Sequence, residues 1–236
     1  MVKIQVNSQG KAYYTSEGKV LLAQDVGKYT LLQRIKDDNG NEIGTVGGFF
    51  TADDNIEYAL VVLDARYRGN GGEYPSKALL SRNDISGIGL SSHNDNGWSC
   101  FRDRKTATYN TQAILDYATA NSLTSAVCNF CRSKSFVIDG VTYYGQLPNL
   151  SELLMIANVS STINSMDTSV SSNSSLRIPR TNNDNMGSRT WSSTVNTVSS
   201  SGSFWALYPT SAGGIGSRFL TDSYYFILPI LELPNK

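Results

Sequence analysis

An uninterrupted apolar run occupies residues 60–63, with the sequence Leu-Val-Val-Leu. Such a run is typical of a β-strand that is buried on both faces. Residues 56–63 and 43–50 together predict a pair of strands, joined by a polar turn at 51–55. With 236 residues, of which 40% are apolar, the chain is long enough to bury a sizeable core around this pair. We expect either one large domain or one domain with a small appendage.

Two later segments carry apolar residues at helical spacing and predict amphipathic helices. The first spans about 108–121, with Asn110 as the expected N-cap. The second begins after Pro148, where Asn149 followed by Glu152 resembles a capping box. The residues expected to face the core are Thr111, Ile114, Leu115 and Ala118 in the first helix, and Leu150, Leu153, Leu154 and Ala157 in the second.

Residues 1–42 predict a small β region of their own, because short apolar runs alternate with polar residues there. The turn cluster 37–41 contains Asn-Gly, the strongest short hairpin signal, and closes this region. Residues 160–188 are rich in serine and asparagine. That composition indicates either a mobile linker or a long loop pinned onto the domain. Further strands are predicted at 190–195, 203–209 and 224–231.

Several segments resemble motifs of C-type-lectin-like domain proteins from Bacteroides-associated bacteria and their phages. Residues 146–153 (Gln-Leu-Pro-Asn-Leu-Ser-Glu-Leu) resemble the "LP-S-x-x-E-L" opening of the second helix in that group, and residues 191–194 (Trp-Ser-Ser-Thr) resemble the strand that follows. Residues 225–230 lie where the last strand of the group carries an "x-V-R-P-V" pattern. Residues 44–50 and the helix at 110–117 also fit. The order and spacing of these motifs agree over residues 43–233.

The resemblance implies an α+β, C-type-lectin-like fold, in which two helices pack on antiparallel sheets beside a long irregular loop region. The domain would span 43–236 and include the loop 160–188, with residues 1–42 as an anchoring or oligomerising appendage. Leu228 stands where the group has arginine before the proline, so no site built on that arginine is expected. The Glu-Pro-Asn, Gln-Pro-Asp and Trp-Asn-Asp motifs of calcium-dependent lectins are absent from the sequence. Calcium-dependent sugar binding is therefore not expected.

The charge balance argues against nucleic acid as a partner. Charged residues make up 17% of the chain, and 20 basic residues balance 20 acidic ones. Binding to a phosphate backbone relies on clustered cationic side chains. The polar start of the chain predicts no export signal, and no run of about 18 apolar residues predicts a membrane span. A surface rich in Ser, Asn and Tyr without an export signal fits a virion protein that is made in the cytosol and released by lysis.

The few residues suited to catalysis lack a complete motif. The single histidine, His93, has Asp95 nearby in a turn, and we expect an exposed loop histidine rather than a catalytic triad. Cys128 and Cys131 have CxxC spacing, and Cys100 and His93 would be needed to complete a zinc site. The favoured interpretation is two apolar thiols packed near the end of a helix. We therefore expect no enzyme activity, metal or cofactor, with a formylglycine-generating type of enzyme as an alternative.

A recognition face is expected on the long loop and the strands that follow the second helix. Aromatic and arginine residues are the usual energetic anchors of interfaces, and Asn and Asp side chains are suited to hydrogen-bonding a glycan or peptide. The competing interpretation is that Trp191 or Trp205 belongs to the core. The candidate binding residues are Arg180, Asn182, Asn183, Asp184, Asn185, Trp205, Tyr208 and Arg218.

These features predict a non-enzymatic phage virion protein, such as a tail or head fibre or a capsid-decoration subunit. Its partners would be other virion proteins, through the N-terminal region, and a glycan or protein of the host surface. We expect a homo-oligomer, with a trimer favoured, because repetition on a particle multiplies weak contacts. The alternative is a bacterial cell-surface adhesin or carbohydrate-binding module.

Overall fold

The structure of the chain is a computed structural model. It describes residues 27–69, 90, 104–170, 177–178, 190–196 and 226–236, together with the backbone of five further strands. Those strands are β1 (Lys3–Val6), β2 (Ala12–Ser16), β3 (Lys19–Leu22), β10 (Ser203–Leu207) and β11 (Ile215–Phe219).

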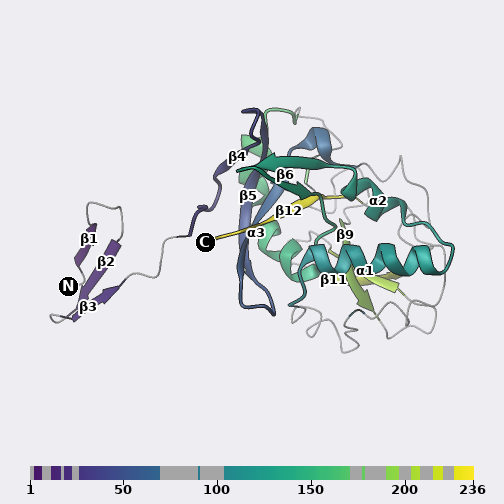
Figure 1. Cartoon of the computed structure of the whole chain (residues 1–236), viewed down its shortest axis with the longest axis horizontal. Helices are drawn as coiled ribbons and strands as arrows, with labels where there is room; N and C mark the ends of the chain where they lie inside the picture. The colour runs from purple at the N-terminus through teal and green to yellow at the C-terminus, as the bar shows by residue number, and fades with distance from the viewer. Residues whose placement is uncertain are drawn as a thin grey trace.

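A four-stranded antiparallel sheet organises the described part of the chain (Figure 1). Its strands, in spatial order, are β12 (Ile230–Pro234), β6 (Glu57–Leu63), β5 (Glu42–Thr51) and β4 (Arg34–Lys36). The strand β6 is central, with Val61 opposite Val46 on one side and Leu231 on the other. Every residue of β6 from Ala59 to Leu63 is buried, so the expected strand with two covered faces is confirmed.

The two faces of β6 belong to different parts of the core, because successive side chains of a strand point to opposite sides. Leu60 and Val62 pack with Phe50 and with the apolar side of the helix α3 (Leu150–Met166). On the other face, Ala59, Val61 and Leu63 pack with Ile43, Val46 and Leu231. The sheet is thus covered on both sides, as a strand with no polar alternation requires.

A β-hairpin packs on the second of these faces, the one formed by Ala59, Val61 and Leu63. It consists of β7 (Ser135–Ile138) and β8 (Val141–Tyr144), joined by Asp139 and Gly140. Both turn residues have positive φ, at 52° and 74°, as the tightest hairpin turns require. Phe136 packs against Tyr67 with ring centroids 5.0 Å apart in an edge-on arrangement. The sequence interpretation did not include this hairpin.

The remaining helices support a second sheet. The helix α1 (Ala107–Ala120) contacts β9 (Thr190–Asn196) and α2 (Ala126–Arg132). The strand β9 pairs with β10, and β10 pairs with β11, in a three-stranded antiparallel sheet (Figure 1). The strands β1, β2 and β3 form a third antiparallel sheet. The α+β class, with helices packed on antiparallel sheets, is therefore confirmed.

Several boundaries differ from the sequence prediction. The N-cap of α1 is Thr106, whose side chain accepts from the Tyr109 N–H, and Asn110 lies buried inside the helix. The helix α3 continues to Met166, so residues 160–166 are helical rather than loop. The reason is that Ile163 and Asn164 are buried, so the core-facing side of the helix continues beyond the apolar residues whose spacing predicted it.

The boundary between an N-terminal region and the main domain also needs adjustment. The strand β4 pairs with β5 across the predicted division at residue 42. Tyr29 and Ile35 belong to the core on one face of the central sheet. Residues 29–36 thus pack with the four-stranded sheet. A separate N-terminal region stays a prediction only for the segment before residue 29.

Candidate functional site

The predicted recognition face falls largely outside the described residues. This applies to Arg180, Asn182, Asn183, Asp184, Asn185 and Tyr208. Trp205 lies on β10, in register with Ser217, and Arg218 lies on β11, in register with Phe204. Residues directly opposite one another share a face of a sheet, and neighbours along a strand alternate. Positions 205 and 218 therefore belong to opposite faces of this sheet.

The strand β9 fixes this sheet to the helices. Residues 190–194 are all buried. The Ser193 N–H donates to the Pro148 carbonyl at 2.9 Å, and the Thr194 hydroxyl accepts from the Leu150 N–H at 2.9 Å. Asn110 of α1 donates from its side chain to the Ser193 hydroxyl at 3.3 Å. The Trp-Ser-Ser-Thr segment is thus a buried foundation that joins α1, α3 and the sheet.

Trp191 belongs to the core, as was expected for at least one of the two tryptophans. It is 3% exposed and packs with Ile114, Ile227 and both cysteines of the CxxC segment. The backbone N–H of Trp191 donates to the Phe226 carbonyl at 3.1 Å. The segment before the final strand therefore lies beside the start of β9.

Cys128 and Cys131 lie on α2 with fully buried, free side chains. Burial raises the pKa of the Cys128 thiol to about 12. Burial, and then the neighbouring Cys128, raise the pKa of Cys131 well above its ordinary value. Both sulfurs are therefore thiols at neutral pH, whereas nucleophiles and metal ligands are thiolates. The cysteines lie within a short helix, α2, that the sequence interpretation did not include.

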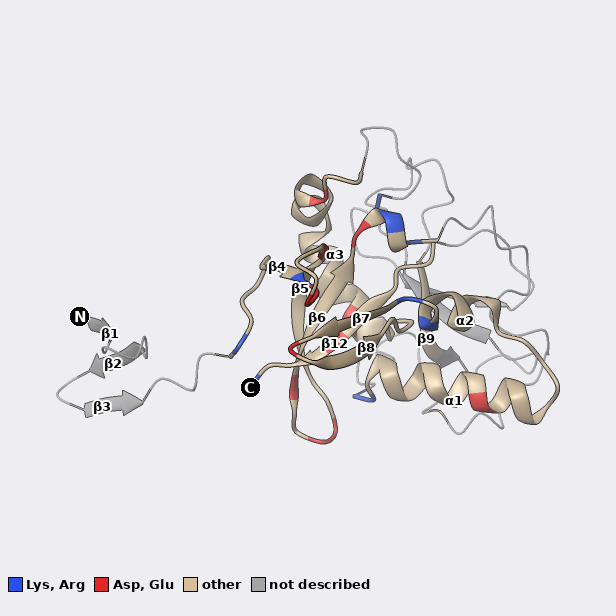
Figure 2. Ribbon diagram, turned by 45° about the horizontal axis from the view of Figure 1, so that its top comes forward, with Lys and Arg blue, Asp and Glu red and all other residues tan. Residues whose placement is uncertain are grey.

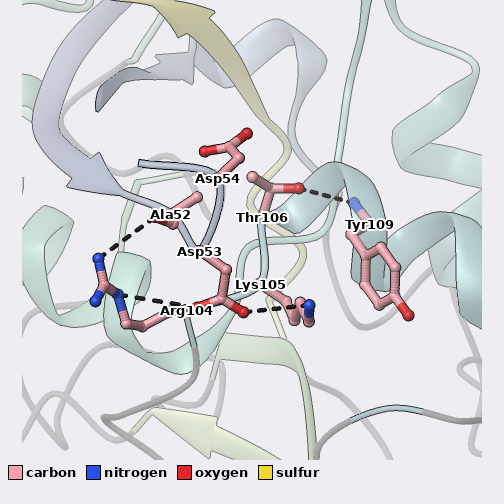
Figure 3. A pocket seen from close by; sticks show the side chains of 7 residues that line it. All are labelled: Ala52, Asp53, Asp54, Arg104, Lys105, Thr106 and Tyr109. Atoms are coloured by element: carbon pink, nitrogen blue, oxygen red, sulfur yellow. Dashed lines mark hydrogen bonds and ion pairs between the residues drawn. The ribbon is translucent and has the colours of Figure 1, made fainter. Parts of the chain in front are cut away.

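The described residues also form a small surface pocket of about 150 Å³, where the turn between β5 and β6 meets the start of α1 (Figure 3). It is smaller than the roughly 300–1,000 Å³ of ordinary ligand pockets. The residues that line it are Ala52, Asp53, Asp54, Arg104, Lys105, Thr106 and Tyr109. Figure 2 shows how sparse charged residues are on the described ribbon, whereas four of the seven residues that line the pocket are charged.

Charges in the pocket pair with one another. The Lys105 ammonium lies 3.2 Å from the Asp53 carboxylate, and the Arg104 Nε lies 4.0 Å from it. Lys105 also lies over the half-exposed ring of Tyr109, 5.1 Å from its centroid. The Asp54 carboxylate accepts from the Tyr58 hydroxyl at 2.9 Å. The pocket is therefore close to electrically neutral, and its exposed ion pairs contribute little to stability.

The wall of the pocket is held from behind by buried polar groups. The Asn149 side chain donates to the Lys105 carbonyl at 2.8 Å, while its oxygen accepts from the Glu152 N–H at 2.8 Å. The predicted capping box of α3 is confirmed. The Ala107 N–H, at the start of α1, donates to Glu232 at 2.8 Å. The sequence pattern predicted this cap but not the second hydrogen bond, by which Asn149 also holds the residues before α1.

Two further contacts involve the residues after β6 and the end of α3. Arg68 lies 3.0 Å from Asp167, with both side chains fully buried. Burial lowers the pKa of Arg68 to about 10, and the Asp167 charge opposes this shift, so the guanidinium stays charged at neutral pH. The Asn164 side chain pairs with the backbone of Ile178 through two bonds of 3.0 and 2.9 Å. At Ile178, therefore, the Ser/Asn-rich segment is pinned onto the domain, one of the two expected alternatives.

Within the part of the chain that the structure describes, no three His, Cys, Asp or Glu side chains lie close enough to hold a metal ion. His93 and Cys100 lie outside that part. Across the same described residues, no helix has both the length and the apolar character needed to cross a membrane.

Comparison with known proteins gives no relative: no family model, no curated protein and no solved structure matches the chain. The resemblance to C-type-lectin-like proteins therefore stays a prediction that rests on the motifs in the sequence.

Proposed function

We propose that the chain is a non-enzymatic phage virion protein, a fibre or capsid-decoration subunit, whose C-type-lectin-like domain binds a glycan or protein on the host surface. The observation that carries the proposal is the buried strand β9, which forms a rigid base for the sheet of β9, β10 and β11. Binding surfaces are commonly formed by loops and strands that a rigid scaffold positions. Trp205 and Arg218 lie on the two strands that continue outward from this base.

The anchoring of neighbouring segments supports the same role. Asp167 at the end of α3 pairs with Arg68, and Asn164 holds Ile178. A segment that is fixed at its roots loses less conformational entropy on binding, because part of the ordering cost is met during folding. The Asn-rich residues 182–185 follow this pinned point in the sequence.

The state of the thiols favours binding over catalysis. An enzyme of the formylglycine-generating type would use its paired cysteines as reactive groups. Here Cys128 and Cys131 pack in an apolar cluster with Trp191 and Leu147. Their burial disfavours the thiolate.

Immunogold electron microscopy of lysates, with antibody against the purified chain, tests the virion assignment. We expect gold on the outside of phage particles. Gold on the surface of intact bacteria would overturn that assignment in favour of a cell-surface adhesin.

Flow cytometry of the fluorescently labelled full chain on intact Bacteroides cells tests the recognition face. We expect Trp205→Ala or Arg218→Ala to weaken binding at least tenfold, since interface anchors contribute about 2 kcal/mol or more. Because the two positions belong to opposite faces, only one of them is expected to have this effect. Ser217→Ala, in register with Trp205, is the matched control. Unchanged binding in both variants would contradict the proposed face.

A further inference from the structure

Two buried glutamates meet beneath the start of α1. Glu152 of α3 is fully buried, and Glu232 of β12 is 6% exposed. The Ala107 N–H donates to both, at 3.3 Å to Glu152 Oε1 and 2.8 Å to Glu232 Oε1. The carboxyl groups are close enough for Glu232 to raise the pKa of Glu152, after the larger effect of burial. The two side chains therefore lie side by side, although they come from different elements.

The other carboxyl oxygens also have donors. Glu232 Oε2 accepts from the Thr108 N–H at 2.8 Å and from the Thr108 hydroxyl at 2.6 Å. Glu152 Oε2 accepts from the Asn149 N–H at 2.7 Å, which closes the capping box of α3. Glu232 thus caps the first turn of α1, where the helix dipole favours a negative charge. Glu152 caps α3 in the same way, and one cluster joins α1, α3 and β12.

The surrounding charged groups are engaged elsewhere. Before α1, the Lys105 ammonium pairs with Asp53. On β6, Tyr58 donates to Asp54, and burial with this bond raises the pKa of the Tyr58 hydroxyl to about 12. Glu57, also on β6, accepts from the Asn235 side chain at 2.7 Å. The bonds described at the carboxyl pair come from neutral N–H and hydroxyl groups, which only partly offset one buried charge and do not offset two.

We infer that Glu152 and Glu232 share one proton at neutral pH and act as an acid-stabilised latch, which fastens the start of α1 to α3 and β12 and loosens in alkali. The physical reason is that two carboxylates in contact cannot both ionise cheaply, so one retains its proton and donates it to the other. The inference is independent of what the chain binds.

The sign of the pH effect follows from linkage. Burial, and then the charge of Glu232, raise the pKa of Glu152 well above its ordinary value. The unfolded chain releases the same proton near pH 4.3. This contribution to stability is therefore complete below about pH 4.3 and is lost as the pH rises through the folded-state value. Within that window the unfolding equilibrium constant rises by up to about tenfold for each pH unit.

Denaturant unfolding of the full chain between about pH 5 and pH 9 tests the latch with Glu152→Gln. The glutamine amide keeps the size of the side chain and supplies a permanent N–H to Glu232, while its oxygen can still accept from Asn149. We expect the variant to become more stable than the wild type as the pH rises, by up to about tenfold in the unfolding constant per pH unit within the window. Asp116→Asn removes an exposed carboxylate from α1 and should unfold with the pH dependence of the wild type. An identical pH dependence in the wild type and Glu152→Gln would overturn the inference.

Carbon-13 NMR of the glutamate carboxyl groups gives a second readout, and its deciding result is obtained with the wild-type chain. We expect the Glu152–Glu232 pair to lose its second proton well above the ordinary range for glutamate. In Glu232→Gln the Glu152 titration should move down, because the like charge is removed, but stay raised by burial. Titration of Glu152 near pH 4.3 in the wild type would show an ordinary carboxylate and overturn the latch.

Discussion

The Arg68 guanidinium lies 3.0 Å from the Asp167 carboxylate, and neither side chain is exposed to solvent. Arg68 also donates from Nε to the Leu63 carbonyl at 2.8 Å, and Asp167 accepts from the Ala65 N–H at 2.7 Å. The pair thus joins the end of β6 to the end of α3. It brings together two points that are far apart in the sequence.

Loss of one partner of this pair should be strongly destabilising. Arg68→Met leaves Asp167 as a buried charge without its cation, and breaking a buried ion pair costs about 3–5 kcal/mol. Urea unfolding measures the change in the free energy of unfolding. The double variant Arg68→Met/Asp167→Leu is the control, and we expect it to recover much of the loss, since no buried charge remains. A cost below about 1 kcal/mol for Arg68→Met would contradict this account.

Asn149 should contribute more than an ordinary helix cap. Asn149→Ala removes both the cap of α3 and the donor to the Lys105 carbonyl. We expect a loss of about 1 kcal/mol for the cap and about 1–3 kcal/mol for the unsatisfied carbonyl. Asn149→Ser keeps a capping oxygen without the second donor, so thermal unfolding should place it between wild type and Asn149→Ala. Equal stability of Asn149→Ser and the wild type would show that the Lys105 contact contributes nothing.

The thiols of α2 should be unreactive in the folded protein. In a Cys100→Ser background, an aromatic disulfide reagent at neutral pH should modify neither Cys128 nor Cys131, because both are buried and protonated. Both should react once denaturant unfolds the chain. Reaction of the native protein at the rate of a free cysteine would contradict the buried position. Cys128→Ala should also leave cell binding unchanged.

Gly44 and Gly140 should respond to alanine for different reasons. A Cβ at Gly44 would lie 2.4 Å from the Val62 carbonyl oxygen, on the neighbouring strand. Since that contact is backbone, Gly44→Ala should force the β5–β6 pair apart and cost about 1–3 kcal/mol. Gly140→Ala meets open space but must adopt a φ of 74°, at about 1 kcal/mol. Chemical denaturation measures the loss in the free energy of unfolding for both variants. A larger loss for Gly140→Ala than for Gly44→Ala would contradict this account.

Local patterns predicted the elements whose causes lie within a few residues. The run at residues 60–63 predicted a doubly buried strand, and Asn149 with Glu152 predicted the cap of α3. The cap of α1 was predicted at Asn110 but lies at Thr106. A buried Asn110 bonded to Ser193 is stabilised by tertiary contacts, which the local spacing does not report.

The candidate site was less accessible to prediction. The pocket joins the β5–β6 turn to residues 104–109, and these segments are distant in sequence. The register of β10 and β11 separates Trp205 from Arg218 by face, although both were assigned to one surface. That assignment considered residue type and the place of the strands along the chain, whereas the side of a sheet depends on pairing.

The sequence by itself determined the α+β class, the central strand pair and the start of α3, because apolar periodicity and capping act between residues that are neighbours along the chain. Only the tertiary structure decided that Arg68 meets Asp167 and that Glu152 meets Glu232. A buried charge or carboxyl group depends on which partner the packing brings within hydrogen-bonding distance, and that partner lies on another element. The protonation of these groups is therefore a property of the folded chain, not of the segments that carry them.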